Sequence, residues 1–233
     1  MKILKFCLIV LFTLVLFSCK KETENLSRST YYVAFEIKGD NPAIVQVGEP
    51  YVDAGFIATE HGKAFTGKVT TKTNVNYKEM GIYQVEYSAT NIDGLESRAI
   101  REVIVCNPGV TTDIGGVWNV SSAGTYRSAA GTPTYYGGAG YTVRITKLAP
   151  GFFSVSDYLA GWYAVRAGYG SGYAFTGNIA LNEDNTISYI SGKMDPWGMG
   201  MQSFNNAKYD PIVNTVKWEY GWNNWIFYVT LTK

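Results

Sequence analysis

Acidic side chains in the second half of the sequence are the first candidates for chemistry. Two carboxylates held near each other can cleave a glycosidic bond, one as the acid and the other as the base or nucleophile. Asp184, Asp195 and Asp210 each lie beside Asn or Pro, as turn-forming aspartates commonly do. We therefore expect a protein that is not an enzyme and has no catalytic residue. The full set of candidates is Asp157, Glu183, Asp184, Asp195, Asp210 and Glu219.

The other catalytic templates do not fit the sequence. Segment 168–172 (GYGSG) has its serine outside the middle position that a nucleophile elbow requires. His61 is the only histidine, so a histidine-dependent triad in the second half would need both halves to share one site. No strand-to-helix unit accompanies the glycines, and the three cysteines form no metal-type cluster. We expect neither a cofactor nor a metal site.

Two tryptophans stand among residues that end strands. Trp197 lies in the segment 195–200 (DPWGMG), and Trp222 is followed by Asn223 and Asn224. A tryptophan at a loop tip exposes a large apolar face on which a sugar ring can stack, while neighbouring amides hydrogen-bond to its hydroxyl groups. We expect these four residues to bind a ligand. The alternative is that each indole folds back and closes one end of the domain.

The second half concentrates the aromatic residues. From residue 111 onward it holds all six tryptophans, twelve of the eighteen tyrosines and five of the eleven phenylalanines. Alternation favours core rows at Trp218 and Tyr220, and at Trp225, Phe227 and Val229. Short runs between turns, without a convincing helix, predict an antiparallel β-barrel or β-sandwich over residues 110–233. The expected strands are 116–122, 141–148, 152–156, 162–165, 173–181, 186–191, 199–204, 215–220 and 225–232.

The first half also predicts short strands separated by turns. Tyr83, Val85 and Tyr87 alternate with polar residues, which places one face in a core and one in water. Cys106 ends an apolar run and is expected to be a small buried side chain. The pattern predicts a small antiparallel sandwich. Its expected strands are 31–37, 43–47, 52–59, 68–73, 82–89 and 95–105.

Two segments of this half carry a family resemblance. Residues 47–56 (VGEPYVDAGF) and 81–94 (GIYQVEYSATNIDG) resemble bacterial immunoglobulin-like domains of surface proteins and crystal toxins. Those domains have a G-x-x-Y-x-D-x-G opening and a strand pair of the form G-x-Y-x-V-x-Y-x-A-x-D-x-x-G. The resemblance implies an immunoglobulin-like β-sandwich over residues 31–107. Asp53 and Asp93 could form half of a calcium site, but the family pattern favours an Asp53 that fixes a turn through backbone hydrogen bonds.

A domain boundary is expected at the turn residues Asn107-Pro108-Gly109. Beyond it, residues 114–120, 156–163 and 185–187 resemble C-terminal domains of exported lipoproteins from polysaccharide-degrading gut anaerobes. The Gly116-Val117-Trp118 opening is also similar to lipocalin-like barrels. Neither resemblance implies an enzymatic activity.

The N-terminal segment predicts export. Lys2 and Lys5 precede an apolar run that ends at Leu16-Phe17-Ser18-Cys19, which predicts a signal peptide over residues 1–18. Residues 16–19 resemble the lipobox of bacterial lipoproteins, which implies that Cys19 is lipidated and carries a tether over residues 19–30. Acidic residues soon after Cys19 resemble the export signal of surface lipoproteins, which implies the outer membrane and its outer face. The periplasmic face is the alternative.

Charge and composition complete the hypothesis. Without Lys2 and Lys5, 18 basic residues face 19 acidic ones, a balance that predicts no nucleic-acid partner. We expect a non-catalytic cell-surface lipoprotein that is held to the membrane by its lipid. It would bind a polysaccharide or oligosaccharide and work with outer-membrane uptake proteins. Two alternatives stay open: a barrel that carries a small apolar ligand in an interior cavity, and a structural or protein-interaction role.

Overall fold

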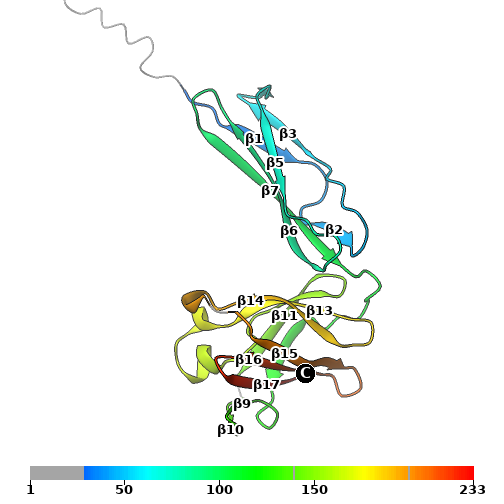
Figure 1. Cartoon of the computed structure of the whole chain (residues 1–233), viewed down its shortest axis with the longest axis vertical. Coiled ribbons are helices and arrows are strands. Elements are labelled where there is room, and N and C mark those ends of the chain that lie inside the picture. The colour runs from blue at the N-terminus through cyan, green and yellow to red at the C-terminus, as the bar shows by residue number, and fades with distance from the viewer. Residues whose placement is uncertain (1–28, 139, 199) are drawn as a thin grey trace, which may run out of the picture.

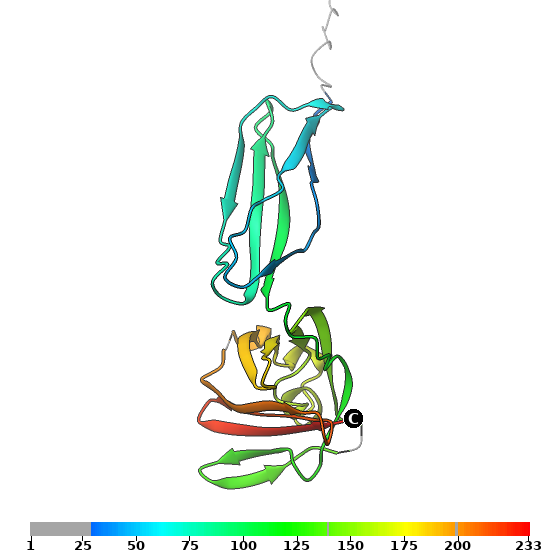
Figure 2. The same ribbon diagram turned by 90° about the vertical axis from the view of Figure 1, so that its right-hand side faces the viewer.

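The computed structural model describes residues 29–138, 140–198 and 200–233. The predicted signal peptide and the lipidation site Cys19 lie outside the described residues, as does most of the tether. The described chain folds into an N-terminal and a C-terminal region joined end to end (Figures 1 and 2). None of the helices in the described part is both long and apolar enough to cross a membrane.

The N-terminal region is a sandwich of two sheets. One sheet has the order β1–β3–β4 and the other β2–β7–β6–β5. Val85, Tyr87, Val103 and Val105 form the buried centre between them, as the alternation in β6 predicts. The pairs are antiparallel except that β2 runs parallel to β7, which the sequence did not indicate. The strands are β1 (Val33–Ile37), β2 (Ala43–Gln46), β3 (Phe56–Glu60), β4 (Lys63–Ala64), β5 (Val69–Thr73), β6 (Gly81–Thr90) and β7 (Glu96–Cys106).

A buried ion pair ties the 47–56 segment to this sandwich. The Arg101 side chain is 1% exposed, and its Nε lies 2.9 Å from Oδ1 of Asp53. The hydroxyl groups of Tyr51 and Tyr87 donate hydrogen bonds to the same carboxylate, at 2.9 and 2.6 Å. Burial alone would raise the pKa of Asp53, but the hydrogen bonds from Tyr87 and Tyr51 and the charge of Arg101 outweigh it and lower that pKa. The expected turn role of Asp53 is thus too narrow, because its main partners are side chains.

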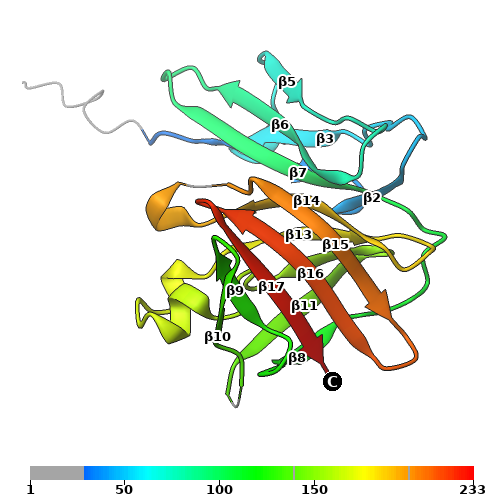
Figure 3. The same ribbon diagram turned by 60° about the horizontal axis from the view of Figure 1, so that its bottom comes forward.

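The C-terminal region is one ten-stranded sheet that curls into a half-barrel. The order is β10–β9–β17–β8–β11–β12–β13–β14, with β16 on β17 and β15 on β16. The two edges of the curl approach each other at one isolated bridge, Thr186 to Lys208. Figure 3 shows β15, β16 and β17 crossing over β11 and β13 of the far side. The strands are β8 (Gly116–Val120), β9 (Tyr126–Ala129), β10 (Thr132–Tyr135), β11 (Thr142–Ala149), β12 (Phe152–Val155), β13 (Thr176–Leu181), β14 (Ile187–Lys193), β15 (Ser203–Asp210), β16 (Thr215–Trp222) and β17 (Trp225–Thr232).

Large side chains fill the inside of the curl. Trp118, Tyr158, Trp218, Tyr220 and Phe227 are each no more than 1% exposed. The Trp118 indole N–H donates to the Ile114 carbonyl and that of Trp218 to the Tyr158 carbonyl, both at 2.8 Å, which satisfies these buried donors. The all-β prediction and the core rows of β16 and β17 are confirmed. Phe227 and Trp218 lie inside, as their alternation predicts.

Two local predictions in this region are wrong, and one hairpin was missed. The expected strand 162–165 is instead a short π-helix, η1 (Trp162–Arg166), entered through Gly161 at φ 90°. The hairpin of β9 and β10 was not predicted. The expected strand 199–204 is replaced by β15, which begins only at Ser203. Two short 3₁₀ turns complete the region, η2 (Ser171–Tyr173) and η3 (Asp195–Trp197).

The two regions meet through a small apolar contact. Ile104 and Cys106 at the end of β7 pack with Ala149 and Phe152 of the half-barrel, and all four side chains are buried. The amide of Asn107 also donates to Oε1 of Glu183 at 3.2 Å. The expectation that Cys106 is buried is confirmed.

Candidate functional site

Five aromatic rings gather at one end of the half-barrel. We call this set the aromatic patch: Tyr163, Tyr169, Tyr173, Trp197 and Trp222. They come from η1, from the glycine-rich segment before η2, from η2 itself, from η3 and from the end of β16. Tyr163 and Trp222 are buried and form its floor, whereas Tyr169 and Trp197 are 55% and 38% exposed. Residues far apart in sequence thus build one continuous apolar surface.

Trp197 is the centre of this patch. Its ring lies 5.0 Å from that of Tyr163, 5.2 Å from Tyr173 and 5.8 Å from Tyr169, in edge-on arrangements. It stacks on Trp222 at 5.8 Å with only 4° between the ring planes. Offset stacking and edge-to-face contacts are the favoured geometries of aromatic pairs. The indole is therefore held in place on one side and open to solvent on the other.

The expectation that Trp222 lies exposed at a loop tip is wrong. Trp222 is the last residue of β16, is 4% exposed and pairs directly with Trp225 of β17. Asn223 and Asn224 form the whole turn, with φ of 51° and 62°. Positive φ at both central residues defines a two-residue hairpin turn that asparagine readily adopts. Trp222 supports Trp197 from below, and Asn223 and Asn224 are exposed beside it.

Asp157 holds the loops that carry the patch. Its Oδ1 accepts hydrogen bonds from the backbone N–H groups of Leu159 and Phe175, at 2.9 and 3.1 Å, and its Oδ2 accepts one from Gly161 at 2.8 Å. Burial raises its pKa to about 6, against the lowering effect of these three donors. Its three hydrogen bonds to backbone N–H groups make Asp157 a structural clamp. It joins the start of η1 to the chain after η2.

The other acidic candidates also have structural roles. Oδ1 of Asp184 accepts from the Thr186 N–H, and that of Asp210 accepts from the Ile212 N–H, as expected of turn formers. Asp195 lies 2.7 Å from the Lys193 ammonium at the start of η3. Among the described residues, no group of three His, Cys, Asp or Glu side chains is close enough to hold a metal ion.

Sequence reasoning missed Tyr169 and Tyr173. Segment 168–172 does not fit a catalytic motif, but its alternation of glycine with tyrosine could have indicated a bent loop that presents aromatic rings. Gly168 and Gly170 have φ of 75° and 90°, a region that glycine enters without strain. These bends place the ring centroids of Tyr169 and Tyr173 5.1 Å apart and bring both rings beside Trp197.

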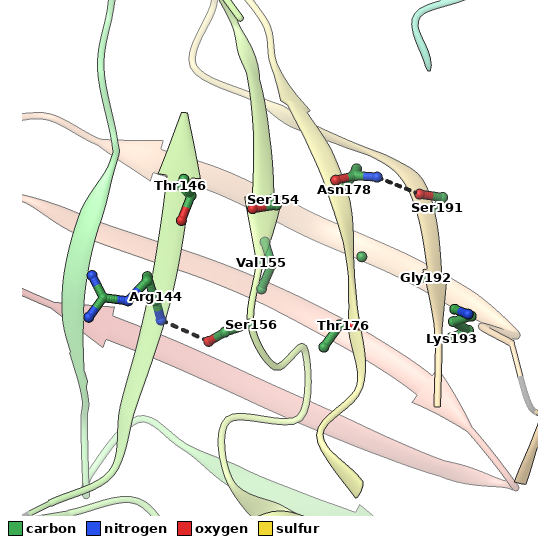
Figure 4. Close-up of a pocket in the computed structure, with 11 residues that line it drawn as sticks. Arg144, Thr146, Ser154, Val155, Ser156, Thr176, Asn178, Ser191, Gly192 and Lys193 are labelled. Atoms are coloured by element: carbon green, nitrogen blue, oxygen red, sulfur yellow. Dashed lines mark hydrogen bonds between the residues drawn. The ribbon is translucent and has the colours of Figure 1, made fainter. Parts of the chain in front are cut away.

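A hollow on the outer face of the sheet is separate from the aromatic patch and is lined by different kinds of side chains. It has a volume of about 570 Å³ and crosses β11 to β14 (Figure 4). Its lining mixes apolar surface with hydroxyl and amide groups, and the Asn178 amide donates to Oγ of Ser191 at 3.0 Å. It contains no aromatic ring on which a sugar could stack. Its lining residues include Arg144, Ser154, Ser156, Thr176, Asn178 and Lys193.

The chain is similar to two family models and to solved structures of Bacteroides proteins. A family model described as a bacterial surface protein, Ig-like domain, matches residues 35–105, and a model described as a C-terminal domain matches residues 107–233. The sequence is 33% identical to the lipoprotein BT2262 from Bacteroides thetaiotaomicron, over 87% of this chain and 100% of that one, with a TM-score of 0.49. A Bacteroides ovatus protein of unknown function is 8% identical over 86% of this chain and 93% of that one, with a TM-score of 0.28. No curated protein matches the sequence.

Proposed function

The chain belongs to the same family as the Bacteroides lipoprotein BT2262, and from that premise we propose that it is a non-catalytic surface lipoprotein whose aromatic patch binds glycans. The observation that carries the proposal is the exposed, preorganised indole of Trp197 on a floor of buried rings. A sugar ring stacks on such a face, and the exposed amides of Asn223 and Asn224 lie on the adjoining turn.

The N-terminal region fits the role of a spacer in this proposal. Its interior groups are paired with one another, and its first strand, β1, begins at the end that lies away from the half-barrel (Figure 1). The patch is then carried away from the membrane, in reach of a polysaccharide and of outer-membrane uptake proteins. The outer face of the outer membrane is the proposed location.

The alternative of an interior ligand has less support. A barrel that carries a small apolar molecule needs room inside the curl, as ligand-binding barrels have. Here Trp118, Trp218 and Tyr220 occupy that space with at most 1% exposure. The patch on the outside is the better candidate.

Affinity electrophoresis on a panel of polysaccharides tests the proposal. Trp197→Ala and Tyr169→Ala should each weaken retention at least about tenfold, by analogy with the loss of an interface anchor. The matched control is Tyr135→Ala, because Tyr135 is 56% exposed on β10 and outside the patch. Equal retention of the wild type and both patch variants would overturn the proposal, as would a wild type that no polymer in a broad panel retains.

The proposed anchor has its own test. Cys19→Ala should yield a protein that incorporates no palmitate and leaves the membrane fraction, because the lipid is its only proposed membrane attachment. Wild-type labelling and membrane retention of the variant would contradict this.

A further inference from the structure

Two arginines border the aromatic patch and share one indole. The guanidinium carbon of Arg127 lies 4.3 Å from the ring centroid of Trp162, and that of Arg166 lies 5.1 Å from it. Arg127 is also 4.3 Å from the ring of Trp225. Such cation–π contacts fix a guanidinium group in place and remove part of its water.

Neither arginine has a carboxylate partner. Across residues 29–138, 140–198 and 200–233, the ion pairs involve Arg98 and Arg101 among the arginines, but not Arg127 or Arg166. The Nε atom of Arg127 is buried and also lacks a hydrogen-bond partner. Buried polar groups are nearly always paired, as those of Arg101 are, so Arg127 differs from it in this respect.

Trp162 and Trp225, on which the arginines lie, link them to the aromatic patch. Trp162 precedes Tyr163, whose ring touches both Trp197 and Trp222 at 5.0 and 5.3 Å. On the other side, Trp225 lies 6.4 Å from Trp222. Arg166 is exposed and Arg127 is half-buried, so solvent reaches both side chains.

The chemistry of this border selects one kind of ligand. A guanidinium group is a planar donor that binds carboxylate and sulfate oxygens through two parallel hydrogen bonds. Two acidic side chains of these loops already have partners: Asp157 is buried and accepts three backbone hydrogen bonds, and Asp195 in η3 pairs with Lys193 at 2.7 Å. Two unpaired positive charges beside stacking rings therefore favour a sugar that carries its own negative charge.

We propose that the aromatic patch binds an acidic saccharide, whose carboxylate or sulfate group pairs with Arg127 and Arg166 while its ring stacks on Trp197. This inference rests on the proposed glycan-binding function and specifies the class of glycan. A carboxylate and a sulfate group can each offer two oxygens to a guanidinium group, so the test must separate them.

The experiment compares a neutral glucan, a polyuronate and a sulfated glycan as probes for the full chain. We expect at least about tenfold stronger retention by one acidic polymer than by the neutral one, falling as salt rises because charged contacts are screened. The acidic polymer that is retained identifies carboxylate or sulfate as the group recognised. Equal or stronger binding of the neutral glucan would overturn the inference and leave the proposed function standing, whereas no binding to any polymer would overturn the proposed function itself.

Arginine variants locate the charge. Arg166→Gln should weaken binding of the acidic polymer about tenfold, and Arg166→Lys should restore only part of it, because lysine cannot form the paired hydrogen bonds. Arg166 is exposed, so this pair of variants leaves the fold intact. Arg127→Gln should act in the same direction, read together with its melting curve.

The matched control is Arg144→Gln, an exposed arginine in the outer hollow that makes the same change in net charge. It should leave binding unchanged. An equal loss in Arg144→Gln and Arg166→Gln, or no loss in Arg166→Gln, would contradict the assignment of the anion to the patch.

Discussion

The two regions treat arginine and aromatic side chains in opposite ways. In the N-terminal sandwich Arg101 is buried against Asp53, and Phe35, Phe56 and Tyr87 pack on one another inside. In the described part of the half-barrel, Arg127 and Arg166 take part in no ion pair. Arg101 is thus paired inside the first region, whereas the second region, over its described residues, has two arginines without an ion pair close to partly exposed aromatic rings. That contrast supports the proposed division into a spacer and a binding domain.

The largest expected effect follows from breaking the ion pair between Arg101 and Asp53 in the first region. Asp53→Ala leaves the buried charge of Arg101 with neutral acceptors, mainly backbone carbonyl groups. Because Asp53 is 26% exposed, we expect a loss of unfolding free energy in the lower part of the range, about 3–5 kcal/mol, that is typical of a broken buried ion pair. Because all six tryptophans follow residue 111, tryptophan fluorescence reports only the second region, while circular dichroism reports both. We expect the variant to lose stability by circular dichroism with an unchanged fluorescence transition.

This variant also tests the predicted boundary at residues 107–109. A fluorescence midpoint that falls together with the circular dichroism midpoint would show that the regions unfold as one unit. The matched control is a pair of separate chains, 28–107 and 110–233, each of which should fold and unfold cooperatively. Failure of both to fold would mean that the contact of Ile104 and Cys106 with Phe152 is part of one shared core.

The next effect separates the floor of the patch from its outer ring. Trp222→Ala removes a buried indole and should lower the unfolding free energy by about 3 kcal/mol, the lower end for such truncations. Trp197→Ala removes a ring that is 38% exposed and should lower it far less. Guanidinium denaturation followed by fluorescence compares them, and equal losses would show that both indoles are core residues.

The smallest expected effect is the dependence of stability on pH, which has opposite directions in the two regions. Burial raises the pKa of Asp157 to about 6, so the folded half-barrel holds an extra proton between about pH 4 and 6, where an exposed aspartate has already lost it. Stability from this group is present below pH 4 and is lost as pH rises to 6, by up to about 2–3 kcal/mol. The pKa of Asp53 is lowered, so its contribution is lost on acidification instead.

Melting curves followed by tryptophan fluorescence measure the first of these trends. The midpoint of the half-barrel should fall between pH 4 and 6, and the fall should be smaller in Asp157→Asn, which cannot ionise. A midpoint that rises over this window in the wild type, or a slope unchanged by the substitution, would refute the role assigned to Asp157.

The predictability of the fold differs between the regions for physical reasons. Alternation in β6 placed Val85 and Tyr87 in the core correctly, because a sheet with one buried face has a strict period of two. The same logic failed at Trp162, since Gly161 at φ 90° turns the chain into η1 before a strand can form. Aromatic residues suit strands in general, so their composition alone could not show this.

The site was harder to predict than the fold. The Asn223-Asn224 pair could have indicated a two-residue hairpin, which would have kept Trp222 inside β16 and away from a loop tip. The patch itself could not be predicted, because Tyr163, Tyr169 and Trp197 meet only through contacts between distant loops. Trp197 was found because its neighbours Pro196 and Gly198 end strands.

Oxidative footprinting of the full chain, with and without a saturating glycan that it retains, tests the central claim most directly. Trp197 is the tryptophan most open to solvent and should oxidise fastest in the free protein, as read by mass spectrometry. We expect the bound glycan to protect Trp197 and Tyr169 from oxidation, while Tyr135 should oxidise at the same rate as in the glycan-free protein. Unchanged oxidation of Trp197 at saturation would contradict it.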